Sequence, residues 1–138
     1  MSYPISKIPN MDAAIAAKLK AQRIRTTAKL LEQAKNARGR EKLARAIGVD
    51  ECTILKWANA ADHMRIKGIG DDYARLLGEV RVTVRGLQHR NPKHLAQAMA
   101  EANRRMKENG TAVEFLPSEK AIKKWIECAR NLPLKISY

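Results

Sequence analysis

The chain has 138 residues, a length that suits one domain or two very small ones. Hydrophobic residues make up 45% of it, enough for a core, whereas aromatic residues make up only 4%. This composition argues against a β-sandwich and predicts a folded helical protein. No apolar run approaches the roughly 18–20 residues that cross a bilayer, and residues 1–10 lack the apolar segment of a secretory signal, so we expect a cytoplasmic protein with no membrane partner.

Positive charge is the strongest global feature of the sequence. Lys and Arg number 27 against 14 Asp and Glu, which gives a formal net charge of +13. Residues 18–45 alone carry ten basic and two acidic side chains. Such an excess favours polyanionic partners, above all nucleic acid, and an acidic protein would satisfy the same charge.

Helix start and stop signals follow one another along nearly the whole chain. A capping residue precedes each run of apolar positions at helical spacing, and glycine or proline often follows the run. We expect the second helix to end around residues 36–39 and the third to span residues 40–47. Residues 80–84 are rich in valine but too few for a lone strand, so they are expected to form a connector. The predicted helices follow Asp12, Thr26, residue 39, Asp50, the turn at 68–70, Asn91 and Ser118.

These signals predict an all-α fold of about eight to ten helices. The chain also contains a weak internal repeat. Residues 8–12 align with residues 66–70 at an offset of 58, and this register pairs Leu19 with Leu77.

Toward the end of each copy the offset rises to 68, where it pairs Trp57 with Trp125. The second copy therefore holds extra residues, which we place between residues 95 and 114. We expect the two copies to pack as one body and to divide the chain into residues 1–65, residues 66–133 and a tail at 134–138.

The sharpest local signal is the turn Gly68-Ile69-Gly70, which precedes a predicted helix. Two glycines permit backbone conformations that other side chains disfavour, Ile69 can enter the core, and amides at a helix N-terminus can bind phosphate. Residues 62–78 resemble the helix-hairpin-helix motif. That resemblance implies contact with a nucleic-acid backbone without sequence readout, assisted here by Lys67 and Arg75.

The turn departs from the phosphate-binding form of that motif. In that form a proline and a basic residue commonly follow the turn, whereas Asp71 and Asp72 follow this one. Two carboxylates suit the positive end of a helix, but they repel phosphate. Residues 9–12 of the first copy lack both glycines and are expected to be structural. A tight turn between packed helices, without any ligand, is the competing interpretation of residues 68–70.

Over residues 5–133 the tandem arrangement resembles the bacterial family called domain of unknown function 4332. The resemblance implies two degenerate helix-hairpin-helix units and nucleic-acid binding, and it carries over no catalytic residues. It rests on Ile8 and Pro9, residues 24–27, residues 48–51, Trp57, residues 64–70, Pro117, Ser118 and Trp125.

A second DNA-binding pattern overlaps the first copy. Residues 41–57 resemble a helix-turn-helix, with Gly48 at the turn. In that geometry residues 51–53 and Lys56 would approach the major groove. Because Asp50 and Glu51 would lead with negative charge, we favour helix packing over groove reading.

We expect backbone contact to be shared between the turn and the basic side chains of the first copy, with DNA preferred over RNA. The alternative is a structural or protein-interaction module with no nucleic-acid role. The candidate nucleic-acid-binding residues are Lys67, Gly68, Ile69, Gly70, Arg75, Arg23, Arg25, Arg38, Arg40 and Lys42.

Signals for catalysis are weak. The three histidines stand apart from both cysteines, and no metal-ligand spacing, nucleotide loop or nucleophile elbow is present. We therefore expect no enzymatic activity, no metal and no cofactor. Cys52 and Cys128 are expected to be buried thiols, and Trp57 and Trp125 to be core residues.

Overall fold

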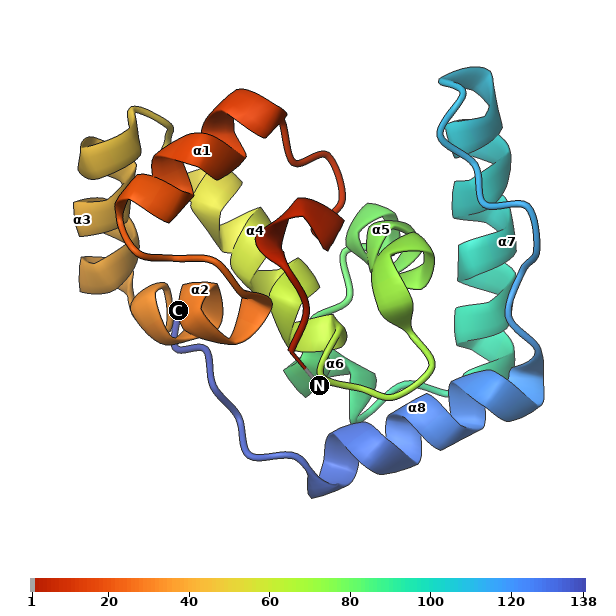
Figure 1. The fold of residues 1–138 in the computed structure, drawn as a ribbon. Helices are drawn as coiled ribbons and strands as arrows, with labels where there is room; N and C mark the ends of the chain where they lie inside the picture. Colours follow the sequence, from red (N-terminus) through yellow and green to blue (C-terminus); the bar gives the residue numbers. More distant parts are fainter. Residues whose placement is uncertain (1) are drawn as a thin grey trace.

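The computed structural model describes residues 2–138, and Figure 1 shows that their regular structure is helical. Within these residues the only β-type pairing is an isolated antiparallel bridge between Pro4 and Thr26. The prediction of an all-α fold is confirmed. The elements are η1 (Ile5–Lys7), α1 (Ala13–Ala21), α2 (Thr27–Gln33), α3 (Ala37–Ile47), α4 (Glu51–His63), α5 (Gly70–Val80), α6 (Val84–Leu87), α7 (Pro92–Glu108) and α8 (Glu119–Asn131).

The predicted capping residues begin the helices that they were expected to begin. Each side chain accepts a hydrogen bond from a backbone amide two or three residues further along the chain, which satisfies a donor that the helix itself leaves free. Gly48 ends α3 in the left-handed conformation, with φ of 75°. These confirmed caps are Asp12, Thr26, Asp50, Asn91 and Ser118.

The boundary between the second and third helices was predicted wrongly. Asn36 does not end α2; its side chain accepts a hydrogen bond from the Gly39 amide at 2.8 Å and starts α3 at Ala37. Gly39 fits there because a Cβ would lie 2.1 Å from the carbonyl oxygen of Gln33. The glycine therefore permits a close approach inside the first turn of a helix, where the sequence pattern indicated a stop.

The connector predicted at residues 80–84 is confirmed in outline. Helix α5 ends at Val80, Arg81 takes the left-handed conformation with φ of 65°, and Thr83 caps the short helix α6. The same local geometry occurs in the first half, where Arg23 has φ of 64°.

Hydrogen bonds at the offset of 58 repeat between the two halves. The amide of Ile24 donates to the carbonyl of Leu19, and the amide of Val82 donates to that of Leu77. The repeat found in the sequence is therefore also a repeat of backbone geometry.

The extra residues of the second half lie where the change of offset placed them. Helices α4 and α8 each have 13 residues and start at Glu51 and Glu119, an offset of 68. Helix α7 has 17 residues against 11 in α3, and a longer loop follows it. The insertion thus lengthens the third helix of the second half and its exit loop.

The buried apolar residues form two clusters. One is built from side chains between Ile5 and Ala58, and the other from side chains between Met64 and Ala129. Helix α4 connects them, because it packs against α2 and α3 as well as against α5 and α6.

The two ends of the chain cross over between these clusters. Tyr3 packs against the second cluster, whereas Ile136 packs against the first. The Ser137 amide donates to the carbonyl of Lys35 at 2.7 Å, and the Tyr138 hydroxyl donates to Asn59 at 2.7 Å. The tail is therefore bound along the first half of the chain.

Arg40 does not lie on the exposed basic surface where the sequence placed it. It is buried, with 6% of its surface exposed, and its guanidinium donates to the carbonyls of Ala34 and Ser137, each at 2.9 Å. Position 40 lies three and four residues before the buried Leu43 and Ala44, so it is on the face of α3 that packs against the core. Arg40 holds the C-terminal tail against α2 and α3.

Arg40→Met should destabilise the protein by about 2–3 kcal/mol, because it keeps the aliphatic stem but leaves the buried Ala34 carbonyl without its donor. Urea unfolding measures this change. Arg38→Met alters an exposed arginine of the same helix and should change stability by less than about 0.5 kcal/mol. Equal losses in the two variants would contradict the anchoring role of Arg40.

The tryptophan predictions are confirmed and the cysteine prediction is wrong. Trp57 and Trp125 are buried in the first and second clusters. Cys52 is exposed and Cys128 is half-buried, and both are free thiols. Cys52 lies in the first turn of α4 on the side opposite Ile54 and Trp57, so helix geometry turns it toward solvent.

Candidate nucleic-acid interface

The turn between α4 and α5 has the geometry that its glycines suggest. Gly68 and Gly70 have φ of 94° and 59°, a region in which other side chains are strained. Ile69 between them is buried, with 2% of its surface exposed, as predicted. In the described part of the chain no side chain caps the N-terminus of α5, so its first amides are free to meet an outside acceptor.

Charges around this turn are nearly balanced. Asp71 and Asp72 are exposed in the first turn of α5. Arg75 is committed to its own helix, because its guanidinium lies 3.3 Å from the Asp72 carboxylate. Among residues 2–138, Lys67 forms no ion pair and is exposed. Of the two predicted basic helpers, Lys67 is therefore the freer one.

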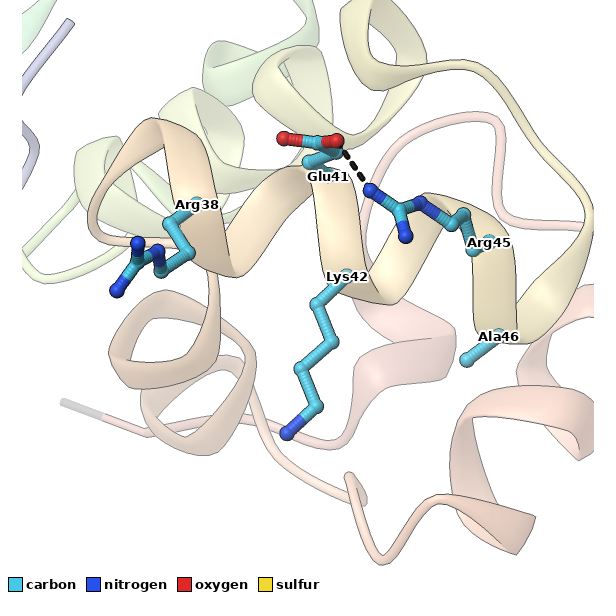
Figure 2. Close-up of a pocket in the computed structure, with 5 residues that line it drawn as sticks. All are labelled: Arg38, Glu41, Lys42, Arg45 and Ala46. Atoms are coloured by element: carbon cyan, nitrogen blue, oxygen red, sulfur yellow. Dashed lines mark hydrogen bonds and ion pairs between the residues drawn. The ribbon is translucent and has the colours of Figure 1, made fainter.

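The basic face of α3, defined here as Arg38 and Lys42 with their neighbour Arg45, is open to solvent. Figure 2 shows that the side chains of Arg38 and Lys42 extend on one side of the helix, while Arg45 turns back to Glu41. The five residues drawn there line a shallow surface depression. Arg38 and Lys42 form no ion pair within residues 2–138, so their charges are available to an external anion.

Helix α1 and the connector after it add further basic side chains to the positively charged surface around α3. Arg23 and Arg25 are exposed on the connector to α2. The Lys18 ammonium group lies 3.5 Å from the carbonyl of Ile47, at the C-terminus of α3. A cation is favourable at that negative helix end, which brings α1 and α3 together at one place.

Nine exposed Lys and Arg side chains of the first half form a surface that we call the basic surface of the first half. Only one of them, Arg45, has an ion-pair partner among residues 2–138. Its members are Lys18, Lys20, Arg23, Arg25, Lys29, Lys35, Arg38, Lys42 and Arg45.

The two groups of predicted ligands do not form one site. Helix α3 lies at the left edge of Figure 1, whereas the loop that leads into α5 lies near the centre, just above α8. Lys67, Gly68, Ile69, Gly70 and Arg75 therefore form one group. Arg23, Arg25, Arg38 and Lys42 form another, from which the buried Arg40 is excluded.

The helix-turn-helix interpretation of α3 and α4 loses one of its reading residues. The Thr53 hydroxyl donates to the Asp50 carboxylate at 2.9 Å, and the Thr53 amide donates to the same oxygen at 2.8 Å. These bonds lower the pKa of Asp50 and keep it charged. An anionic cap and an occupied hydroxyl then stand where a groove-reading helix would present donors, beside the exposed Glu51.

Sequence reasoning missed a second depression, between α5 and α7. Arg81, Arg90 and Arg105 line it from three different elements, together with Glu79 and Glu101. Arg105 lies 3.7 Å from Glu101. The one feature of the sequence that pointed to this depression is that Arg81 repeats the position of Arg23 at the offset of 58.

Among residues 2–138, no three His, Cys, Asp or Glu side chains are grouped closely enough to hold a metal ion. None of the helices described between residues 2 and 138 has the length and hydrophobicity needed to span a bilayer.

A family model described as a domain of unknown function (DUF4332) matches residues 9–132. The chain belongs to this family. The DUF4332 match begins just before α1 and ends just after α8, so it includes both halves of the repeat and the Gly68–Gly70 turn. No curated protein and no solved structure shows significant similarity to the chain.

Proposed function

We propose that this DUF4332 protein is a non-catalytic, sequence-independent binder of nucleic-acid backbone, with DNA preferred over RNA. The observation that carries the proposal is the basic surface of the first half, in which nine exposed cations have a single ion-paired member among the described residues. Long cationic side chains on several elements can follow a row of phosphates, because such contacts need charge and reach rather than fixed base geometry.

The Gly68–Gly70 turn supplies a second and weaker contact in this proposal. We interpret the turn with α5 to α8, within residues 66–133, as a degenerate helix-hairpin-helix unit, and η1 to α4, within residues 1–65, as its more diverged copy. Support comes from the positive φ values of both glycines and from the uncapped start of α5. Both tryptophans are buried, which argues for backbone contact rather than base stacking on an indole ring.

Fluorescence anisotropy with labelled duplex DNA, single-stranded DNA and duplex RNA tests this proposal. At about 50 mM salt we expect micromolar or tighter binding that does not depend on base sequence, and strong weakening at about 200 mM salt. No binding to any of the three probes at low salt would refute it.

A protein-interaction module is the competing function, favoured by the exposed Asp71 and Asp72 at the turn. Competition separates the two functions. An unlabelled duplex should displace the labelled one at much lower charge concentration than polyglutamate, because polyglutamate lacks the phosphate spacing of a nucleic acid. Equal competition by both polymers would favour docking to an acidic protein.

Gly68→Val should weaken duplex binding about fivefold, because a β-branched side chain disfavours the left-handed backbone that presents the turn. Gly110→Val is the matched control, since Gly110 also has positive φ, 71°, but lies at the far end of α7. Both changes should cost about 1–2 kcal/mol of stability, measured by urea unfolding. Only the change at Gly68 should alter binding; equal weakening would assign the loss to strain alone.

A further inference from the structure

Trp125 lies under the Gly68 turn with its only polar atom directed at that turn. Its side chain is 97% buried, since 3% of its surface is exposed. The indole Nε1 is the nearest atom to the position that a Cβ on Gly68 would occupy, 3.4 Å away. No hydrogen bond joins this N–H to another group of residues 2–138, and it is not among their buried unpaired atoms, so it reaches solvent at the turn. Tyr73 packs against the indole, with ring centroids 5.2 Å apart.

The indole N–H is the one polar group of an otherwise buried side chain, and it is exposed only at this turn. A Trp N–H in such a position can donate to water or to a ligand that replaces the water. Gly68 is exposed and has no side chain, so the region directly above the N–H is open to solvent. The acceptor can therefore come from outside the chain.

We propose that the Trp125 indole N–H and the free amides at the start of α5 form one oxyanion site, which accepts a phosphate oxygen of a nucleic-acid backbone. The amides alone would be only a helix N-terminus; the buried indole, a side chain from α8, is a separate donor aimed at the same turn. This inference rests on the proposed function and names a binding residue for it.

The charges near the site explain why a neutral donor matters. Lys67 and Arg75 are offset by Asp71 and Asp72, so net charge contributes little attraction at the turn. Asp72 is already held by Arg75. Directed N–H donors then decide whether a phosphate binds, and a variant that removes one donor should show a clear loss.

The first half of the chain provides a built-in comparison. Trp57 occupies the position equivalent to Trp125, and Asn10 occupies the position equivalent to Gly68. Asn10 also has a positive φ, 64°, but it carries a side chain. We therefore assign no such site to the first turn, and Trp57 serves as the matched control.

Nitrogen-15 NMR of the full chain tests the inference, because the two tryptophans give two indole signals. Trp57→Phe and Trp125→Phe assign them. The protein is titrated at low salt with a short DNA duplex and, separately, with inorganic phosphate. We expect the Trp125 indole signal to shift with both ligands and the Trp57 signal to stay. Trp125→Phe should weaken duplex binding about tenfold and Trp57→Phe should not.

The outcomes separate the inference from the function on which it rests. Duplex binding with a stationary Trp125 signal overturns the inference and leaves the proposed function standing. A Trp125 signal that follows phosphate, in a protein that binds no duplex, supports the oxyanion site and refutes the nucleic-acid function. A stationary signal with both ligands overturns the site even if Trp125→Phe proves too unstable to study.

Discussion

Reversing two charges on α3, by Arg38→Glu together with Lys42→Glu, is expected to weaken duplex DNA binding about 100-fold at about 50 mM salt. Both side chains are exposed, extend on the same side of the helix and form no ion pair among residues 2–138 (Figure 2). Each therefore has its whole charge available to a phosphate. Anisotropy titrations over a range of salt concentrations measure the loss.

The slope of log K against log salt should fall by about two, because each neutralised phosphate contributes close to one unit. The double change Arg104→Glu with Lys107→Glu is the matched control. It removes the same charge from exposed positions near the C-terminus of α7, at the opposite edge of the molecule from α3 (Figure 1). If the control loses as much affinity and slope, total charge rather than the α3 face governs binding.

Local structure could be predicted well because it depends on a few neighbouring residues. An Asp or Ser cap binds an amide within three residues, so Asp50 and Ser118 indicate helix starts without reference to the rest of the chain. Repeated positions carry the same kind of information. Arg23 and Arg81 share a left-handed backbone because each follows a similar helix end.

Features that depend on packing between distant segments could not be predicted in this way. Arg40 appeared to belong to a basic run, but its partner Ser137 lies 97 residues away in the sequence. Gly39 was interpreted as a stop signal because glycine often ends a helix. The close approach of the Gln33 carbonyl, which requires a glycine at this position, cannot be foreseen from composition.

The candidate site also combines features that depend on neighbouring residues with features that depend on distant segments. The Gly68–Gly70 turn and the buried Ile69 follow from residue type and spacing. That Trp125 would lie beneath Gly68 depends on how α8 crosses the α4–α5 turn, which no short pattern encodes. The separation of α3 from the turn likewise belongs to the tertiary fold (Figure 1).

The buried His63 should make the protein lose stability as the pH falls below neutral. It lies at the end of α4 with 1% of its surface exposed, and neither ring nitrogen has a hydrogen-bond partner within residues 2–138. Burial lowers the pKa of His63 to about 4, and the nearby Val82 backbone offsets only part of that effect. The ordinary value is 6.5.

Between these two pKa values His63 binds a proton in the unfolded chain but not in the folded protein, so folding becomes less favourable as the pH falls. The contribution of neutral His63 to the free energy of unfolding is complete above pH 6.5 and is lost as the pH falls toward 4. The loss reaches roughly 2 kcal/mol at about pH 5. The adjacent Asp62 acts in the opposite direction. Burial raises its pKa despite the Arg65 ion pair, so its charge destabilises the fold less as the pH falls through that raised value.

His63→Leu isolates the histidine, because Asp62 and Arg65 are retained in both proteins. At about pH 7.5 the variant should be at least as stable as the parent, since it removes two unsatisfied polar atoms from the core. The difference in unfolding free energy, from urea titrations, should grow by roughly 2 kcal/mol in favour of the variant by about pH 5. His89→Leu changes an exposed ring and should retain the parent's acid sensitivity. A constant difference between His63→Leu and the parent at both pH values would show that His63 is protonated as readily in the folded protein as in the unfolded chain.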